Sequence, residues 1–320
     1  MSIETICILG GSGFVGQHLA NRLSSDGYRV RILTRRPERH RALSIHPHIS
    51  LHGADVHDPA QLHQHLAGAS TVINLIGILN DPDRKGAGFQ QAHIELPRKV
   101  VQAALECGVQ RLLHMSALNA SADETDSRYL KTKGAGEDLV HSAAAHDLIV
   151  TSLQPSVMFG DGDSFFNRFA SLLRLSPLVF PLACPNSQFA PVYVGDVVEA
   201  ICRSLHDATG GERLELCGPE VFTLQALVEY TRDLIGLHSK IIGLGDRLSR
   251  LQAHVFGLLP GQPFTMDNYY SLQKDSICRY NALPTLGISP TPVAAIVPGY
   301  LAGKNCRARY HDMRRRSGRG

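Results

Sequence analysis

A glycine-rich stretch near the N-terminus constrains the fold of this chain more than any other feature. The apolar run Ile6–Leu9 leads into Gly10, Gly13 and Gly16, which have the spacing G-x-x-G-x-x-G. The first glycine permits a tight turn, the second lets the backbone approach a pyrophosphate, and the third lets a helix pack closely on its strand. The free amides and the positive end of that helix dipole then face the phosphates. Because an apolar helical stripe and a strand at residues 28–33 follow, the pattern predicts dinucleotide binding rather than a plain strand–turn–helix corner.

Apolar strand-like runs alternate with helical patterns along the first half of the chain. Further strands are expected at residues 49–55, 71–77 and 111–116, and the last of them ends at Ser116. This alternation predicts an α/β fold with a parallel, doubly wound sheet, whose ligands bind beyond the carboxyl ends of the strands. The 43% of hydrophobic residues and 19% of charged residues allow a sizeable core.

The strict alternation ends after Gly160, and this change predicts a second, smaller region. We expect a dinucleotide-binding domain at residues 1–155 plus about 191–217, and a discontinuous substrate lobe at 156–190 plus 218–300. Residues 303–320 hold seven basic residues against one acidic residue, a net charge of +6, which leaves −3 for the rest of the chain. This segment is predicted to be a basic, flexible tail.

Cysteines and histidines carry less information about function. The seven cysteines are scattered without a C-x-x-C pair, which predicts reduced, mostly buried thiols. The early first strand leaves no room for a signal peptide, and no apolar run reaches the ~18 residues of a spanning helix, so we expect a cytoplasmic location. Seven of the 16 histidines fall within residues 40–65, but no helical pair stands beside a carboxylate, and no metal site is predicted.

The end of the second expected strand indicates which dinucleotide is bound. An acidic residue there would accept a hydrogen bond from the ribose 2′-hydroxyl of NAD, whereas an arginine accommodates the 2′-phosphate of NADP. This chain offers Arg35 and Arg36 and no acid. The sequence therefore favours NADP(H) over NAD, and the alternative is a solvated basic turn.

A Y-x-x-x-K pattern follows the strand that ends at Ser116. On a helix, Tyr129 and Lys133 lie on one face, and an ammonium beside a phenol would lower the pKa of the tyrosine toward the range useful for proton transfer. Ser116 would then hydrogen-bond the same carbonyl or alcohol oxygen. The alternative is a surface tyrosine and lysine on an amphipathic helix.

Several motifs together resemble the short-chain dehydrogenase/reductase superfamily, in its extended and atypical branch with the NAD-dependent epimerases and dehydratases. The likeness covers residues 4 to about 275 and is greatest to the group of the NADPH-binding accessory subunit of respiratory complex I. The motifs are Gly10-Gly11-Ser12-Gly13-Phe14-Val15-Gly16, Gly53-Ala54-Asp55-Val56, Ser116, Tyr129-Leu130-Lys131-Thr132-Lys133, Gln154-Pro155-Ser156-Val157-Met158-Phe159-Gly160 and Val192-Tyr193-Val194-Gly195-Asp196-Val197.

The resemblance implies a role for each matching position. Residues Gly10 to Gly16, with Ser12, Phe14 and Val15 among them, would hold the pyrophosphate. Asp55 and Val56 would contact the adenine, Ile76 and Gly77 would line the ribose, and Pro155 and Val157 would flank the nicotinamide. Tyr129 and Lys133 would be the acid/base pair, with Lys133 also holding the nicotinamide ribose. The chain departs from the pattern at Gln154, where relatives commonly have arginine, and in its interval of 13 residues between Ser116 and Tyr129.

Two functions remain open at this stage. The preferred one is an NADP(H)-dependent oxidoreductase that acts on a carbonyl or alcohol, including an apolar or quinone-like substrate. The alternative is a non-catalytic NADPH-binding scaffold or assembly subunit of a membrane respiratory complex. The helical stripe at residues 244–258 is expected to face the core, or else to rest with the tail on an anionic membrane surface or a partner. Nucleic-acid binding is not expected, because the tail's charges are not interleaved with aromatic residues beyond Tyr310.

Overall fold

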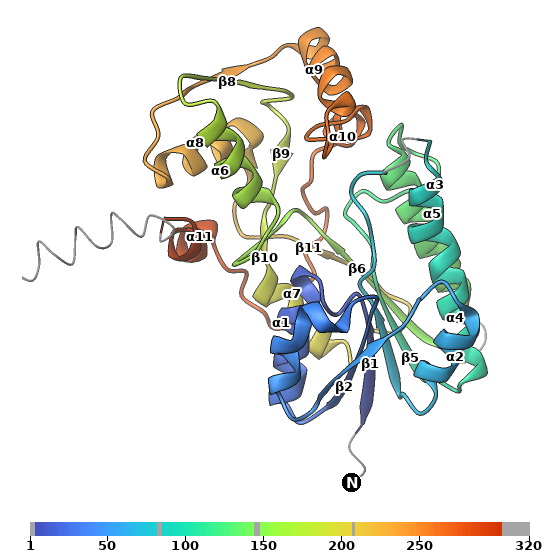
Figure 1. The fold of residues 1–320 in the computed structure, drawn as a ribbon. Coiled ribbons are helices and arrows are strands. Elements are labelled where there is room, and N and C mark those ends of the chain that lie inside the picture. The colour runs from blue at the N-terminus through green and yellow to red at the C-terminus, as the bar shows by residue number, and fades with distance from the viewer. Residues whose placement is uncertain (1–3, 82–84, 144–147, 207–208, 303–320) are drawn as a thin grey trace, which may run out of the picture.

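The central element of the structure is a parallel sheet of seven strands with the order β11-β6-β5-β4-β1-β2-β3. The computed structural model describes residues 4–81, 85–143, 148–206 and 209–302. The strands of the sheet are β1 (Thr5–Leu9), β2 (Arg29–Thr34), β3 (Ile49–Gly53), β4 (Thr71–Asn74), β5 (Arg111–Met115), β6 (Ile149–Pro155) and β11 (Arg213–Leu216). This order reverses at β1, so the crevice for a ligand lies between β1 and β4. The predicted doubly wound α/β fold is therefore confirmed (Figure 1).

Helices cover both faces of the sheet because its strands are apolar on both sides. On one face α1 (Phe14–Ser25) and α7 (Val194–Arg203) pack on the strands. Their side chains Leu19, Leu23 and Val197 belong to one core cluster. The other face carries α2 (Pro59–Leu66), α4 (Leu96–Glu106) and α5 (Arg128–Ser142). A short 3₁₀ helix, η1 (Pro37–Ile45), connects β2 to β3.

The helical region before β5 is interrupted rather than continuous. It consists of α3 (Ala87–Gln90), the π-helical turn η2 (Gln91–Glu95) and α4, with Pro97 in the first turn of α4. The missing amide of Pro97 costs little in that position. Close packing explains the need for Gly136 on α5, because a β-carbon there would lie 1.8 Å from the carbonyl oxygen of His93 in η2. The π-helical turn therefore fits against α5 over a residue without a side chain.

The elements outside the central sheet gather at its carboxyl edge (Figure 1). They form three two-stranded sheets, β10-β7, β12-β9 and β13-β8, and a separate apolar cluster around Phe159, Phe166 and Leu227. These elements are β7 (Met158–Phe159), α6 (Phe165–Leu175), β8 (Val179–Leu182), β9 (Gln188–Phe189), β10 (Val192–Tyr193), β12 (Phe222–Thr223), α8 (Leu224–Leu234), β13 (Lys240–Gly243), α9 (Asp246–Leu258), α10 (Met266–Ser271) and α11 (Val293–Leu301). The chain returns to the core of the main sheet at Ala282, Leu283 and Ile288 before α11 begins.

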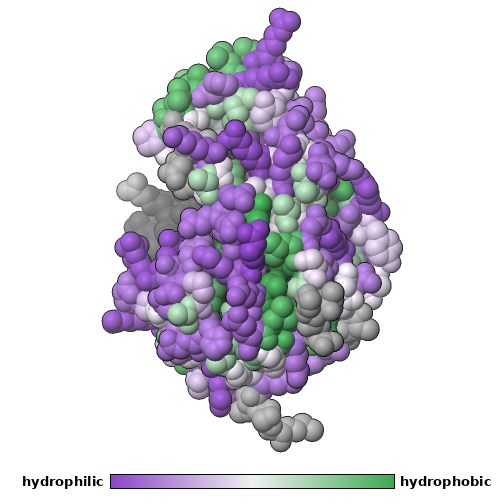
Figure 2. Space-filling model, turned by 90° about the vertical axis from the view of Figure 1, so that its right-hand side faces the viewer, coloured by the Kyte–Doolittle hydropathy of each residue, from purple (hydrophilic) through white to green (hydrophobic). Residues whose placement is uncertain are grey.

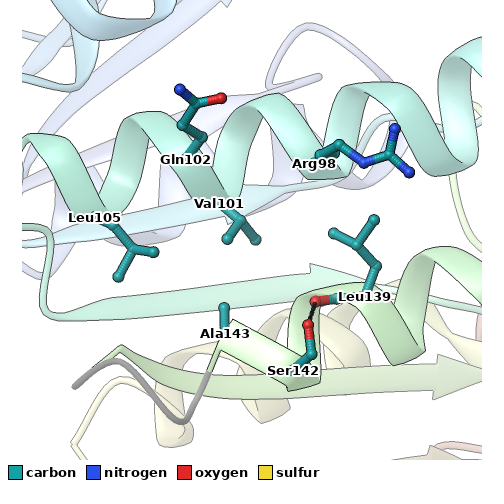
Figure 3. A pocket seen from close by; sticks show the side chains of 7 residues that line it. All are labelled: Arg98, Val101, Gln102, Leu105, Leu139, Ser142 and Ala143. Atoms are coloured by element: carbon teal, nitrogen blue, oxygen red, sulfur yellow. Dashed lines mark hydrogen bonds between the residues drawn. The ribbon is translucent and has the colours of Figure 1, made fainter.

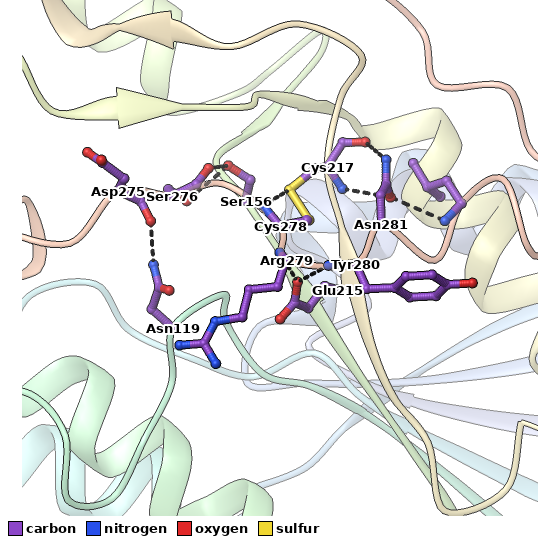
Figure 4. The surroundings of a disulfide bond; sticks show 11 residues. Asn119, Ser156, Glu215, Cys217, Asp275, Ser276, Cys278, Arg279, Tyr280 and Asn281 are labelled. Carbon is purple, nitrogen blue, oxygen red and sulfur yellow. Dashed lines mark hydrogen bonds between the residues drawn. A yellow bond between two sulfur atoms is a disulfide. The ribbon is translucent and has the colours of Figure 1, made fainter.

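A disulfide bond joins Cys217, just after β11, to Cys278 in the segment that follows α10 (Figure 4). The prediction that the cysteines are all reduced thiols is therefore wrong for this pair. Sequence spacing gave no sign of the bond, because the two cysteines are 61 residues apart and meet only when the returning segment lies along the end of β11. The Asn281 side chain donates to the Cys217 carbonyl and accepts a hydrogen bond from the Cys217 amide, and the Arg279 amide donates to Glu215. These hydrogen bonds fix the same contact.

Helix α9 presents most of its apolar stripe to solvent. Leu248, Leu251, Val255 and Leu258 are all exposed, and Leu258 keeps 70% of its accessible surface. The buried face of the helix is formed instead by Ser249 and Ala253. The expectation that this stripe faces the core is therefore wrong. Figure 2 shows hydrophobic side chains at this end of the molecule, which is the end that carries α9 in Figure 1.

Candidate active site

The glycine turn lies between β1 and α1, as the motif predicts. Gly10 has a φ of +78°, and its carbonyl oxygen accepts a hydrogen bond from the Gly13 amide. A β-carbon at Gly16 would lie 2.5 Å from both the Gly10 oxygen and the Gly11 α-carbon, so only glycine fits there. Because α1 begins at Phe14, its free N-terminal amides belong to the turn. This arrangement fits a bound pyrophosphate.

The loop after β4 lies against the same turn. A β-carbon at Gly10 would be 3.2 Å from the backbone nitrogen of Ile76, and the Asn74 side chain accepts a hydrogen bond from that nitrogen. On the other side, a β-carbon at Gly77 would lie 2.8 Å from the Nζ atom of Lys133. The fold therefore brings Ile76 and Gly77 between the glycine turn and Lys133.

A cavity of about 550 Å³ opens at the ends of β2 and β3, and Arg35, Asp55, His57 and Gln61 are among its lining residues. Asp55 is held in its loop, because its carboxylate accepts a hydrogen bond from the His57 amide and its own amide donates to Gln61. Val56 turns inward and is buried, whereas Arg36 is the residue before η1. Four residues are expected to contact the adenosine part of the cofactor. Arg35 and Asp55 line this cavity, whereas Val56 and Arg36 are not among its lining residues.

Tyr129 and Lys133 both lie on α5, in its first two turns. The ammonium of Lys133 is buried and donates to the carbonyl oxygen of Met115 over 2.8 Å. Burial lowers the pKa of Lys133 to about 8, although the charge of Glu137 opposes this effect. A buried lysine with a pKa near neutrality is typical of functional sites.

The pKa of Tyr129 is raised to about 12, first by burial and second by the negative charge of Asp267. The predicted lowering of this pKa by Lys133 is not what the structure shows. The main reason is that the Tyr129 ring is buried; in addition, the Lys133 ammonium is directed to Met115 while the Asp267 carboxylate faces the start of the helix. The aromatic rings of Phe89 and His93 pack edge-on against the Tyr129 ring, at centroid distances of 6.2 and 5.6 Å.

The hydroxyl of Ser116 belongs to a buried hydrogen-bond network around Glu137. It donates to the buried carboxylate of Glu137 over 2.8 Å, and Gln154 donates to both oxygens of the same carboxylate. Burial raises the pKa of Glu137, and these hydrogen bonds oppose the rise. The single hydroxyl proton of Ser116 is thus committed to Glu137, and this geometry does not support its predicted role as donor to a substrate oxygen. Gln154, the departure from the family pattern, is part of the same network.

Pro155 is the last residue of β6, and Val157 follows it at the carboxyl edge of the sheet. The Pro155 carbonyl accepts a hydrogen bond from the Leu118 amide, and the Val157 carbonyl accepts one from Val192. Between them, the Ser156 hydroxyl donates to the Ser276 carbonyl over 2.8 Å (Figure 4). The residue between the two positions expected beside the nicotinamide is therefore tied to the segment that carries Cys278.

Sequence reasoning missed three polar residues near Tyr129, namely His93, Glu137 and Asp267. The Nδ1 atom of His93 shares a hydrogen bond with Thr132, and its Nε2 atom accepts one from the Ile78 amide. Burial and the charge of Lys133 lower the pKa of His93 to about 2, so the ring is neutral. Glu137 continues the helical spacing of Tyr129 and Lys133 by four residues, and this signal was available in the sequence.

A second cavity, of about 330 Å³, lies away from this chemistry. Figure 3 shows it on the outer side of α4 and α5, between Val101, Leu105 and Leu139. Its lining is largely apolar, and Figure 2, which views the molecule from this side, shows hydrophobic side chains gathered there. Within the described ranges, no group of three or more His, Cys, Asp or Glu residues is arranged to hold a metal ion. In the same ranges no helix is both long and apolar enough to cross a membrane.

Residues 6–217 match the profile of the NAD dependent epimerase/dehydratase family, and the chain belongs to this family. It is 30% identical over 311 residues to mouse mitochondrial NADH dehydrogenase [ubiquinone] 1 alpha subcomplex subunit 9, covering 89% of this chain and 76% of that protein. It is also 30% identical over 249 residues to the ceramide reductase of Caulobacter vibrioides, covering 75% and 74% of the two chains.

Solved structures share the fold at lower sequence identity. MoeE5 in complex with UDP-glucuronic acid and NAD superimposes with a TM-score of 0.73 at 19% identity, over 95% of this chain and 99% of that one. The dTDP-glucose 4,6-dehydratase DesIV from Streptomyces venezuelae, with NAD bound, gives a TM-score of 0.73 at 17% identity, over 93% and 95%. The predicted resemblance to the extended branch is therefore confirmed.

Proposed function

We propose that the protein is an NADP(H)-dependent oxidoreductase that acts on the carbonyl or alcohol of an apolar or quinone-like substrate. The observation that supports this most strongly is the buried Lys133, which lies next to Gly77 in the loop after β4 and donates to a backbone carbonyl rather than to a carboxylate. Its burial disfavours the charged form, and the charge of Glu137 offsets this effect only in part. A nicotinamide ribose above Gly77 would give the ammonium further hydrogen-bond acceptors.

The cofactor would lie along the line from Arg35 to Tyr129. The amides of the glycine turn would hold the pyrophosphate, and Arg35 would pair with the 2′-phosphate in the cavity that it lines with Asp55. When bound, the reduced nicotinamide supplies a hydride to the substrate carbon. Tyr129 donates its phenolic proton to the substrate oxygen, so that a carbonyl becomes an alcohol and a tyrosinate remains, which is then reprotonated from solvent. Lys133 would hold the nicotinamide ribose.

The test compares Tyr129→Phe with the wild type and with Tyr280→Phe, which changes an exposed tyrosine. We expect reduction of quinones or other apolar carbonyls to fall by about 10²–10⁴-fold in Tyr129→Phe, while NADPH affinity stays the same. Undiminished turnover in Tyr129→Phe would remove the proton-transfer role.

The second candidate is a scaffold that binds NADPH without turnover, within a membrane respiratory complex. One relative carries the name of an NADH dehydrogenase subunit, and the raised pKa of Tyr129, about 12, lies far from the range useful for proton transfer at neutral pH. In this case the wild-type protein would bind NADPH and reduce no member of a broad carbonyl panel.

The exposed stripe of α9 supports a membrane surface or a membrane complex as partner in both cases. Arg247 and His254 are exposed beside Leu251 and Leu258, as expected for a helix that lies on an anionic lipid surface. The basic segment 303–320, predicted to bind the same anionic surface, lies outside the described residues.

Replacement of Leu251 and Leu258 by glutamate should release the protein from anionic vesicles. Ile45→Glu changes an exposed residue far from α9 in the sequence and should not release it. Equal vesicle binding by all three proteins would exclude the stripe as the contact.

A further inference from the structure

A carboxylate from α10 caps the helix that carries Tyr129. Asp267 Oδ1 accepts a hydrogen bond from the Arg128 amide over 2.6 Å, and Oδ2 accepts one from the Tyr129 amide over 3.2 Å. The Ser127 hydroxyl donates to the same carboxylate and accepts a hydrogen bond from the Leu130 amide. The amides of Arg128, Tyr129 and Leu130 therefore all have acceptors. The acceptor for the first two is Asp267, which lies 138 or more positions further along the chain.

The capping by Asp267 is a contact between two parts of the chain rather than local helix chemistry. Ser127 alone would make an ordinary N-cap. The segment before α10 is also fixed at both sides, because the carbonyl oxygen of Gln262 accepts hydrogen bonds from Asn80 in the loop after β4 and from Arg168 on α6. Asp267 is thus positioned by the elements at the carboxyl edge while it binds the end of a helix of the main sheet domain.

We propose that Asp267 is a positioning residue of the reaction: its carboxylate fixes the first turn of α5 and thereby the place of the Tyr129 phenol, which donates to a substrate oxygen. This proposal rests on the proposed function, since it assigns Tyr129 the role of proton donor. It adds that the segment 262–271, on the substrate side, controls where the phenol lies.

The charges around Tyr129 agree with this assignment. The Asp267 carboxylate, on α10, faces the turn of α5 that carries Tyr129. Lys133 lies one turn further along α5. The neutral His93, on η2, packs against the Tyr129 ring. The Lys133 ammonium is directed to Met115, and the pKa of Tyr129 is raised first by burial and second by the charge of Asp267. A negative charge near a phenol disfavours the tyrosinate.

The experiment compares Asp267→Asn and Asp267→Ala with Asp126→Asn. Asp126 is an exposed carboxylate two residues before α5, so its replacement removes a similar charge from the same helix end without removing the cap. Asp267→Asn keeps one acceptor oxygen and the volume of the side chain, so it retains the fold if the alanine variant does not. Hydrogen exchange of amides 128–130 reports the cap, and the difference in tyrosinate absorbance between each protein and its Tyr129→Phe counterpart reports the ionisation of Tyr129.

We expect exchange at Arg128 and Tyr129 to be about tenfold faster in Asp267→Ala than in Asp126→Asn. In Asp267→Asn the tyrosinate midpoint should move down by about one pH unit, because a negative charge is removed. The kcat for carbonyl reduction should nevertheless fall by about 10–100-fold with the KM for NADPH unchanged, because the phenol is no longer held in place by the capped helix turn. Unchanged exchange would overturn the cap. Faster exchange with an unchanged tyrosinate midpoint and unchanged kcat would leave a merely structural cap and overturn the positioning role. A wild-type protein without turnover would refute the proposed function, and exchange and absorbance would still decide whether Asp267 controls Tyr129.

Discussion

The backbone of Gly77 passes so close to Lys133 that a β-carbon there would lie 2.8 Å from the Nζ atom. Lys133 reaches this point from α5, and its ammonium stays there by donating to the Met115 carbonyl. With the ammonium in this position, no space is left for a side chain at residue 77. Because the atom that would be displaced is the end of a flexible side chain, the fold can tolerate an added methyl group, but the position of the ammonium cannot stay the same.

Gly77→Ala is therefore expected to displace the Lys133 ammonium and impair the site with little loss of stability. NADPH affinity should fall by about tenfold or more, because the displaced ammonium no longer meets the nicotinamide ribose. Calorimetric titration of NADPH and urea unfolding measure the two effects. Gly299→Ala is the control, since nothing lies within 4 Å of a β-carbon at that helical position. An unchanged NADPH affinity in Gly77→Ala would separate Lys133 from cofactor binding.

Arg35→Asp should lower the affinity for NADPH by about 100-fold and change that for NADH only a few-fold. The substitution replaces a partner of the 2′-phosphate by a like charge in the cavity beside Asp55. Titration of both cofactors measures the ratio. Arg39→Asp makes the same change of charge at an exposed position of η1 and should leave the ratio intact. Equal losses for both cofactors would place Arg35 outside the phosphate site.

The stability of the protein should fall in acid because His114 is buried in its neutral form. Its Nδ1 atom is bonded to Asn74, and burial lowers its pKa to about 3, below the value of ~6.5 for an exposed histidine. As the pH falls below ~6.5, the unfolded chain therefore takes up a proton that the folded protein excludes, and stability is lost from there down to about pH 3.

Between pH 7 and pH 4.5 this difference amounts to about 2 kcal/mol of unfolding free energy. His114→Gln keeps an acceptor for Asn74 but does not titrate, so its urea-unfolding free energy should depend less on pH by that amount. His254→Gln, which changes an exposed histidine, should follow the wild type. A His114→Gln protein with the wild-type pH dependence would contradict the buried neutral form.

Loss of the disulfide should destabilise the protein. A bond between residues 61 positions apart restricts the unfolded chain, and removing it costs about 2–4 kcal/mol. Cys217→Ser should therefore unfold at lower urea concentration, and dithiothreitol should lower the midpoint of the wild type but not that of the variant. Cys107→Ser, which changes a free thiol, should leave the effect of dithiothreitol unchanged. Seven free thiols in the denatured, unreduced wild type would show that the bond does not form.

The sequence was sufficient to predict what depends on local patterns. Period and glycine spacing located five of the seven strands of the main sheet, β1 to β5, to within a few residues. The same patterns located the glycine turn and the helix of Tyr129 and Lys133. Such patterns are informative because the backbone geometry of a pyrophosphate site allows few other sequences at these positions.

Contacts between distant parts of the chain could not be predicted in this way. Asp267 meets the Arg128 amide across 139 residues, and the partner of Ser116 became visible only when α5 was packed beside β5. The pKa of Tyr129 is raised first by burial and second by Asp267, and the Y-x-x-x-K spacing shows neither of these causes. The solvent-facing stripe of α9 likewise shows that periodicity defines a helix face but not what covers it.

The bond between Cys217 and Cys278 also changes the covalent topology of the molecule. It closes a ring of chain that contains α8, β13, α9 and α10 and that starts and ends beside β11. A protease cut within that ring does not divide the oxidised protein into two separable pieces, since both fragments stay tied at the sheet edge. The exposed face of α9 and the capping carboxylate of Asp267 lie on the same closed ring, so a nicked molecule retains both until a reductant opens it.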